Sequence, residues 1–113
     1  MNLEINFDSI EAMKANHDFI PAFCKKVLAL LDEFQKDYKK GIINSDAQTL
    51  SDTTHKISST MRLLKLEEFY EFSCSYKKIN LEDRDNTKKL LKQIIEYTEK
   101  LKNDLKAKIS EFS

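Results

Sequence analysis

From Asn44 to Ser113 the chain contains neither glycine nor proline, and Gly41 and Pro21 are the only residues of their kinds. Glycine and proline interrupt helices and are typical of the turns that join strands. A chain with so few of them, and with many helix-forming residues, favours an all-α fold over a sheet. The length of 113 residues is that of one domain, and 41% hydrophobic residues are enough for one core. We therefore expect residues 1–113 to form a single helical domain.

Capping signals predict where the first two helices begin and end. A short helix is expected near residues 8–15, because Phe7 can form a hydrophobic staple and the run from Asp8 to Glu11 resembles a capping box. Asp18 is a candidate N-cap for the second helix, and Pro21 then lies in its first turn, where a missing N–H is tolerated. This helix should end at Lys39 and Lys40, with Gly41 as its left-handed cap.

The second half of the chain is harder to divide. A third helix is expected to begin after Ser45, which forms a possible capping box with Gln48, and either to break near 65–66 or to continue as one very long helix. Average helix lengths favour the break. A fourth helix would then start at Glu67, the loop would span residues 80–86, and Asp85 would cap the last helix.

These segments predict an antiparallel four-helix bundle with a short additional N-terminal helix. The short helix should cover one end of the bundle through Phe7, Ile10 and Met13. The last helix carries Leu101 and Leu105 in a coiled-coil-like spacing, which leaves open a seam for self-association.

Composition excludes several classes of function. Nineteen basic and nineteen acidic residues give a formal net charge of zero, so the chain lacks the basic footprint of a nucleic-acid-binding protein. No stretch approaches the roughly 20 apolar residues of a membrane span, and the first residues lack a signal-peptide pattern, so we expect a cytoplasmic protein. Lysine pairs such as Lys88–Lys89 are interpreted as solvated faces.

Motifs of common enzymes and metal sites are missing from the sequence. There is no glycine-rich phosphate loop, no zinc-protease motif and no paired Glu-x-x-His, so ATP-dependent kinase activity and a metal site are not expected. Cys24 and Cys74 stand 50 positions apart and are interpreted as core thiols. His17 precedes a predicted helix and is interpreted as a polar neighbour of its cap. These exclusions leave His55 as the residue of most interest.

His55 lies on the polar side of an amphipathic helix. With Leu50 at zero and about 100° per residue, the apolar stripe falls within about 40° of Leu50, whereas His55 lies about 140° away. Ser58, Ser59 and Ser51 are its neighbours one turn away. The ring should therefore face solvent among small hydroxyl side chains. Exposed histidines on helices are common, however, so the wheel alone does not assign a role.

The run Thr-His-Lys-Ile-Ser-Ser-Thr-Met-Arg-Leu-Leu-Lys-Leu resembles the histidine-containing phosphotransfer (HPt) domain family. Members of that family carry apolar residues after the histidine, Lys and Gly three and four positions after it, and a glycine turn about ten positions on. This chain has Ser58, Ser59 and Lys65 at the last three places. The apolar positions are filled by Ile57, Met61, Leu64 and Leu66.

The resemblance implies a phosphohistidine carrier of a multistep two-component phosphorelay. His55 would accept a phosphoryl group from the aspartate of a response-regulator receiver domain, which can belong to a hybrid sensor histidine kinase, and pass it to another receiver. The partner would bring the Mg²⁺, and this chain would need no cofactor. The sites that the resemblance and the wheel together suggest are the phosphoryl neighbours Ser58, Ser59, Arg62 and Lys56 and the docking residues Ser51 and Leu63.

Two other functions fit the same sequence. An HPt-like module that has lost the usual Lys and Gly would dock a receiver or kinase without taking phosphate. A structural bundle would self-associate through its last helix. Docking without transfer would indicate the first of these, and self-association that depends on Leu101 and Leu105 would indicate the second.

Overall fold

The computed structural model describes residues 1–13 and 18–112, except for the side chains of residues 12 and 13. All regular secondary structure in this part of the chain is helical. Met13, expected to seal the end of the bundle, and His17 therefore lie outside the described residues or side chains. The elements are α1 (Asp8–Met13), α2 (Phe19–Ile43), α3 (Ala47–Leu63), α4 (Glu67–Ser73), the 3₁₀ helix η1 (Cys74–Lys78) and α5 (Arg84–Ser110).

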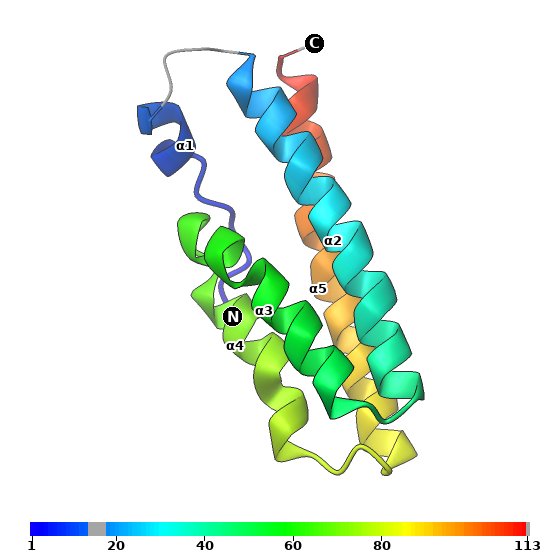
Figure 1. Ribbon diagram of the computed structural model, residues 1–113. Helices are drawn as coiled ribbons and strands as arrows, with labels where there is room; N and C mark the ends of the chain where they lie inside the picture. Colours follow the sequence, from blue (N-terminus) through cyan, green and yellow to red (C-terminus); the bar gives the residue numbers. More distant parts are fainter. Residues whose placement is uncertain (14–17, 113) are drawn as a thin grey trace.

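The helices form an elongated bundle of 48 × 22 × 21 Å. Figure 1 shows the long helices α2 and α5 side by side and running in opposite directions, with α3 and α4 packed along their lower part. Helix α1 lies near the upper end, at the left in this view. Within the described residues, no helix is both long and apolar enough to cross a membrane.

The core is built from one stripe of each long helix. Phe34 packs its ring against Tyr38, with centroids 5.3 Å apart, and against Phe69 of α4, at 6.1 Å. The Tyr38 hydroxyl donates a 2.9 Å hydrogen bond to the carbonyl of Ser73, so this buried phenol is satisfied. Burial raises the pKa of Tyr38 well above its ordinary value, which keeps the phenol neutral as a donor. Other fully buried side chains are Leu31, Leu50, Ile57, Met61, Leu64, Ile94, Leu101 and Leu105.

The break between the third and fourth helices is confirmed, but the two N-caps predicted at Ser45 and Asp85 are wrong. Asp46, not Ser45, caps α3, because its carboxylate accepts hydrogen bonds from the backbone N–H groups of Gln48 and Thr49. A hydrogen bond of 2.7 Å from the Thr49 hydroxyl, together with these backbone bonds, lowers the pKa of Asp46. Asp83, not Asp85, caps α5 in the same way. In each case a neighbouring polar residue reaches the free N–H groups that the predicted cap does not.

Gly41 does not end α2, which continues to Ile43. The left-handed residue after the helix is Ser45, with φ of 50°. Gly41 is buried, and a Cβ atom built on it would lie 2.8 Å from the Cγ and Cδ2 atoms of Leu50. Glycine is therefore needed here for the close approach of α3 to α2, not for a helix-ending conformation.

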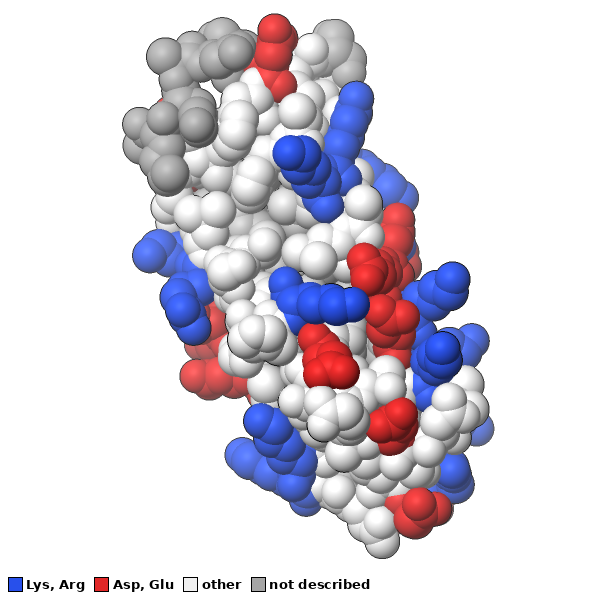
Figure 2. All heavy atoms as spheres, in the orientation of Figure 1, with Lys and Arg blue, Asp and Glu red and all other residues white. Residues whose placement is uncertain are grey.

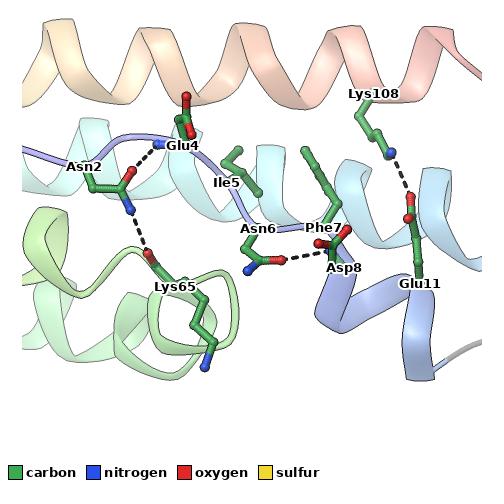
Figure 3. A pocket seen from close by; sticks show the side chains of 9 residues that line it. All are labelled: Asn2, Glu4, Ile5, Asn6, Phe7, Asp8, Glu11, Lys65 and Lys108. Carbon is green, nitrogen blue, oxygen red and sulfur yellow. Dashed lines mark hydrogen bonds and ion pairs between the residues drawn. The ribbon is translucent and has the colours of Figure 1, made fainter.

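The first residues form an extended strap that the helix pattern did not predict. Figure 3 shows residues 2–7 lying between α5 and the turn that joins α3 to α4. The backbone N–H of Asn6 donates to the carbonyl of Leu64, at 3.0 Å, and Lys100 of α5 donates to the carbonyl of Leu3, at 3.1 Å. Alternate strap residues pack on the core, namely Leu3, Ile5 and Phe7.

Lys108 anchors the end of the strap to α5. Its ammonium group forms an ion pair with Glu11 at 2.8 Å and lies 4.9 Å from the centroid of the Phe7 ring. Lys100 and Lys108 are eight residues apart, or about 12 Å along a helix, which matches the four extended residues from Leu3 to Phe7 at about 13 Å. The strap thus runs parallel to α5 and leads into α1 near the upper part of the molecule, where Ile10 is buried.

Lys65 occupies the turn that the strap covers and has φ of 60°. A side chain in this left-handed region costs about 1–2 kcal/mol, and glycine avoids that cost but loses about 0.4–1 kcal/mol more in chain entropy on folding. We predict that Lys65→Gly raises the free energy of unfolding by about 0.5–1 kcal/mol in urea titrations. Lys65→Ala, which keeps a Cβ atom, should show no such gain, and a destabilised glycine variant would contradict the reading of this turn.

Candidate functional site

His55 lies near the middle of α3 and is exposed. The helix is fixed from its opposite side, where Leu50, Thr54 and Ile57 are buried in the bundle. The hydroxyl of Thr54 donates to the carbonyl of Leu50 at 2.9 Å, so this buried polar group is satisfied within the helix. The sequence prediction that the ring faces away from the core is confirmed, and its backbone lies within the hydrogen-bonded helix.

The two serines after His55 are placed differently. The hydroxyl of Ser58 donates to the backbone carbonyl of His55 at 2.8 Å, so in this structure its proton is directed to the helix and not to the imidazole. Ser59 is exposed, one helical turn from His55. Ser51, one turn before His55, is exposed as well. Three of the four residues one turn from His55 are therefore small serines, and the fourth is the exposed Asp52, whose carboxylate accepts a hydrogen bond from Gln48 at 2.9 Å.

Lys56 points toward α2 and forms an ion pair with Glu33, with 3.3 Å between Nζ and Oε1. Both side chains are more than half exposed, so the pair is screened and weak. Glu33 was not identified from the sequence, because nothing in the spacing of α2 shows which of its polar residues faces α3. The nearest lysine to His55 in the sequence is thus partly neutralised by a carboxylate.

Arg62 lies on the other flank of α3, facing α4. Together with Ser58 it lines a hollow of about 180 Å³, whose far wall is formed by Glu67, Tyr70 and Glu71 of α4. Arg62 is exposed and belongs to no ion pair within the described part of the chain. His55 therefore lies on a ridge, with Lys56 directed to α2 and Arg62 directed to α4.

Leu63, predicted to belong to a docking surface, is half-buried at the end of α3. It is not among the side chains that pack against the core. Figure 2 shows the face over α2 and α3, where charged groups of both signs are interspersed with uncharged surface. Such a mixed face suits a polar contact with another protein better than a strongly charged ligand.

The two cysteines differ from each other in burial. Cys24 is fully buried, as expected for a core thiol, and burial raises its pKa. Cys74 is only half-buried, so its interpretation as a core thiol holds in part. Over residues 1–13 and 18–112, no three histidine, cysteine or acidic residues are grouped to hold a metal ion.

Comparison with known proteins adds no further identification. No protein-family model, curated protein or solved structure matches this chain.

Proposed function

We propose that this protein is a phosphohistidine carrier of the HPt type, which accepts a phosphoryl group on His55 and passes it to a second acceptor. The observation that carries the proposal is the exposed imidazole at the middle of a helix whose other side is buried. A rigid and accessible nucleophile among small neighbours is what in-line phosphoryl transfer requires of a carrier. The proposal includes the antiparallel four-helix arrangement, with α4 and η1 together taken as one helix.

The transfer step is a nucleophilic displacement at phosphorus. A neutral ring nitrogen of His55 attacks the phosphorus of an aspartyl phosphate on a receiver domain of a response regulator or hybrid sensor kinase. An N–P bond forms, the P–O bond to the acyl group breaks, and the aspartate leaves as a carboxylate. Both phosphorylated species have high transfer potential, so the step is reversible, and the receiver supplies the Mg²⁺.

The residues around His55 would assist the transfer, whereas the receiver would supply most of the catalytic groups. Arg62 carries no ion pair among the described residues and is available to a phosphoryl oxygen or to an acidic group of the receiver. Ser59 is exposed and can donate a hydrogen bond, whereas Ser58 and Lys56 must first leave their present partners. A carrier with this arrangement, without its own kinase activity, would work in the cytoplasm beside its receivers.

Radiolabelled phosphoryl transfer tests the proposal. The protein is incubated with a phosphorylated receiver domain and Mg²⁺, and acid-labile, base-stable label on this chain is followed. The wild-type protein should become labelled and His55→Gln should not. The chain has two histidines, so His17→Gln is the matched control and should retain the label. A His55→Gln variant that still accepts phosphate would contradict the assignment.

A docking module that takes no phosphate is the second candidate. It is favoured by the engagement of Lys56 with Glu33 and of the Ser58 hydroxyl with the backbone, which leaves neither directed to His55. Receivers that bind in calorimetry but transfer no label would support it. The self-associating bundle loses its main argument, because Leu101 and Leu105 are fully buried within the protomer.

A further inference from the structure

A hollow of about 220 Å³ lies where α3 packs alongside α2, and side chains of both helices line it. Residues three and four apart share one side of a helix, so each helix contributes a single flank. All six side chains that line this α2–α3 hollow are polar, namely Asp37 and Lys40 of α2 and Thr49, Asp52, Thr53 and Lys56 of α3.

Thr53 brings a buried hydroxyl group without a partner to the α2–α3 hollow. Its residue is only 3% exposed. The other buried threonines of the described chain are Thr54, Thr87 and Thr98, and each donates its hydroxyl to the carbonyl four residues earlier, at 2.9, 3.0 and 2.6 Å. The Thr53 hydroxyl has no hydrogen-bond partner among the described residues. Since an unpaired buried hydroxyl is costly, a ligand in the hollow that satisfies it gains affinity.

Two charged groups of the α2–α3 hollow are also without partners. Asp37 is half-buried and Lys40 is exposed, and within the described part of the chain neither side chain forms an ion pair or hydrogen bond, even with the other. The remaining two are engaged, because Lys56 pairs with Glu33 at 3.3 Å and Asp52 accepts a side-chain hydrogen bond at 2.9 Å. The hollow therefore offers a free carboxylate, a free ammonium group and a free hydroxyl.

The residues that line the α2–α3 hollow restrict the class of ligand. None of them is apolar, so a hydrocarbon ligand has nothing to pack against. Two carboxylates and two ammonium groups leave no net charge, which disfavours a simple anion and a simple cation alike. Among the described residues, no three histidine, cysteine or acidic side chains are grouped to hold a metal ion. The complement of this lining is a polar ligand that carries both signs of charge and is neutral as a whole.

We propose that the α2–α3 hollow binds a small dipolar ion of the α-amino acid type. The Asp37 carboxylate and the Thr53 hydroxyl oxygen accept hydrogen bonds from its ammonium group, and Lys40 donates to its carboxylate. The hollow is smaller than the roughly 300–1,000 Å³ of sites for drug-sized ligands, which limits the ligand to a small side chain. His55 does not line the hollow, so this site is separate from the proposed phosphoryl site.

Isothermal titration calorimetry of the full-length protein with glycine, alanine, serine and threonine tests the proposal. At least one of these amino acids should bind with a Kd below about 1 mM. Acetate and methylammonium each carry one of the two charges and should bind at least tenfold more weakly. Their weakness would show that both charges of the ligand are recognised.

Three variants identify the site. Thr53→Val keeps the shape of the side chain and removes its hydroxyl, whereas Asp37→Asn and Lys40→Gln each remove one charge. Each should weaken binding of the amino acid about tenfold. Because the hydroxyl is unpaired in the free protein, Thr53→Val should be at least as stable as the wild type in urea titrations, so weaker binding cannot be attributed to unfolding. The matched controls are Thr60→Val, Asp85→Asn and Lys39→Gln, which lie outside the hollow and should bind within twofold of the wild type.

Three results would overturn the proposal. One is that none of the four amino acids binds with a Kd below about 1 mM, which would leave the hollow to water. Another is that acetate or methylammonium binds as tightly as the amino acid. The third is that Thr53→Val binds like the wild type. His55→Gln should bind the amino acid unchanged, so this test is independent of phosphoryl transfer.

Discussion

Replacing Phe34 with alanine should lower the free energy of unfolding by about 3–5 kcal/mol. Phe34 is 1% exposed and is the ring that joins Tyr38 of its own helix to Phe69 of α4. The variant loses the buried apolar surface and leaves a cavity where α2 meets α4. A domain of this size has a total stability of about 5–15 kcal/mol, so the loss should be visible as a much lower denaturation midpoint.

The neighbouring residue offers the matched control for this prediction. Glu33 is exposed and its ion pair with Lys56 is screened, so Glu33→Ala should change the stability by less than about 1 kcal/mol. If circular dichroism shows that Phe34→Ala does not fold, Phe34→Leu keeps most of the volume and should be intermediate. A Phe34→Ala variant as stable as Glu33→Ala would show that α4 does not pack on α2 through this ring.

Introducing valine at Gly41 should lower the free energy of unfolding by about 1–3 kcal/mol, although glycine is a poor helix former. The first atom of the new side chain would already lie 2.8 Å from Leu50, which is itself fully buried. Since Gly41 belongs to α2 and Leu50 to α3, relief requires the two helices to move apart. Chemical denaturation of the variant measures the cost.

Shortening Leu50 tests the origin of that cost. In a Leu50→Ala background, the valine at position 41 should be tolerated better than in the wild type, which gives a favourable coupling in a double-mutant cycle. Strictly additive effects would mean that the two side chains do not meet. A Gly41→Val variant with the same free energy of unfolding as the wild type would contradict the close approach of α3 to α2.

Much of the fold follows from the period of its apolar residues. The stripe from Leu50 through Ile57 to Leu64 faces the core, and the same periodicity places His55 on the solvent side. The break before Glu67 is also as predicted, despite the missing glycine, because Lys65 adopts the left-handed conformation itself. The period of apolar residues indicates which side of a helix is buried, and the predictions of the core stripe and of His55 depend on that alone.

The errors lie where the outcome depends on a neighbour in space. Several short polar residues can cap a helix, so the choice of Asp46 over Ser45 and of Asp83 over Asp85 depends on the path of the incoming chain. The local pattern at Gly41 predicts a helix end, because glycine commonly follows helices. The glycine is in fact needed for the close contact with Leu50, which belongs to another helix. The strap had a signal in the alternation of Leu3, Ile5 and Phe7, which is typical of extended chain.

The candidate site shows the same division between pattern and proximity. The exposure of His55 follows from the helical wheel, whereas the partners of its neighbours do not. Only the structure shows that Lys56 pairs with Glu33 and that Arg62 faces Tyr70 and Glu71 across a hollow. These contacts engage Lys56 with a carboxylate and leave the serines at 51, 58 and 59 and the exposed Asp52 one turn from His55.

The central claim is tested most directly by finding which residue carries the phosphoryl group. Intact-mass spectrometry at alkaline pH, after mixing with a phosphorylated receiver, should show one added phosphoryl group on the wild type and on His17→Gln. Fragmentation should place it on His55, and His55→Gln should show none. A phosphoryl group on any other residue, or none with receivers that demonstrably dock, would contradict the phosphohistidine carrier.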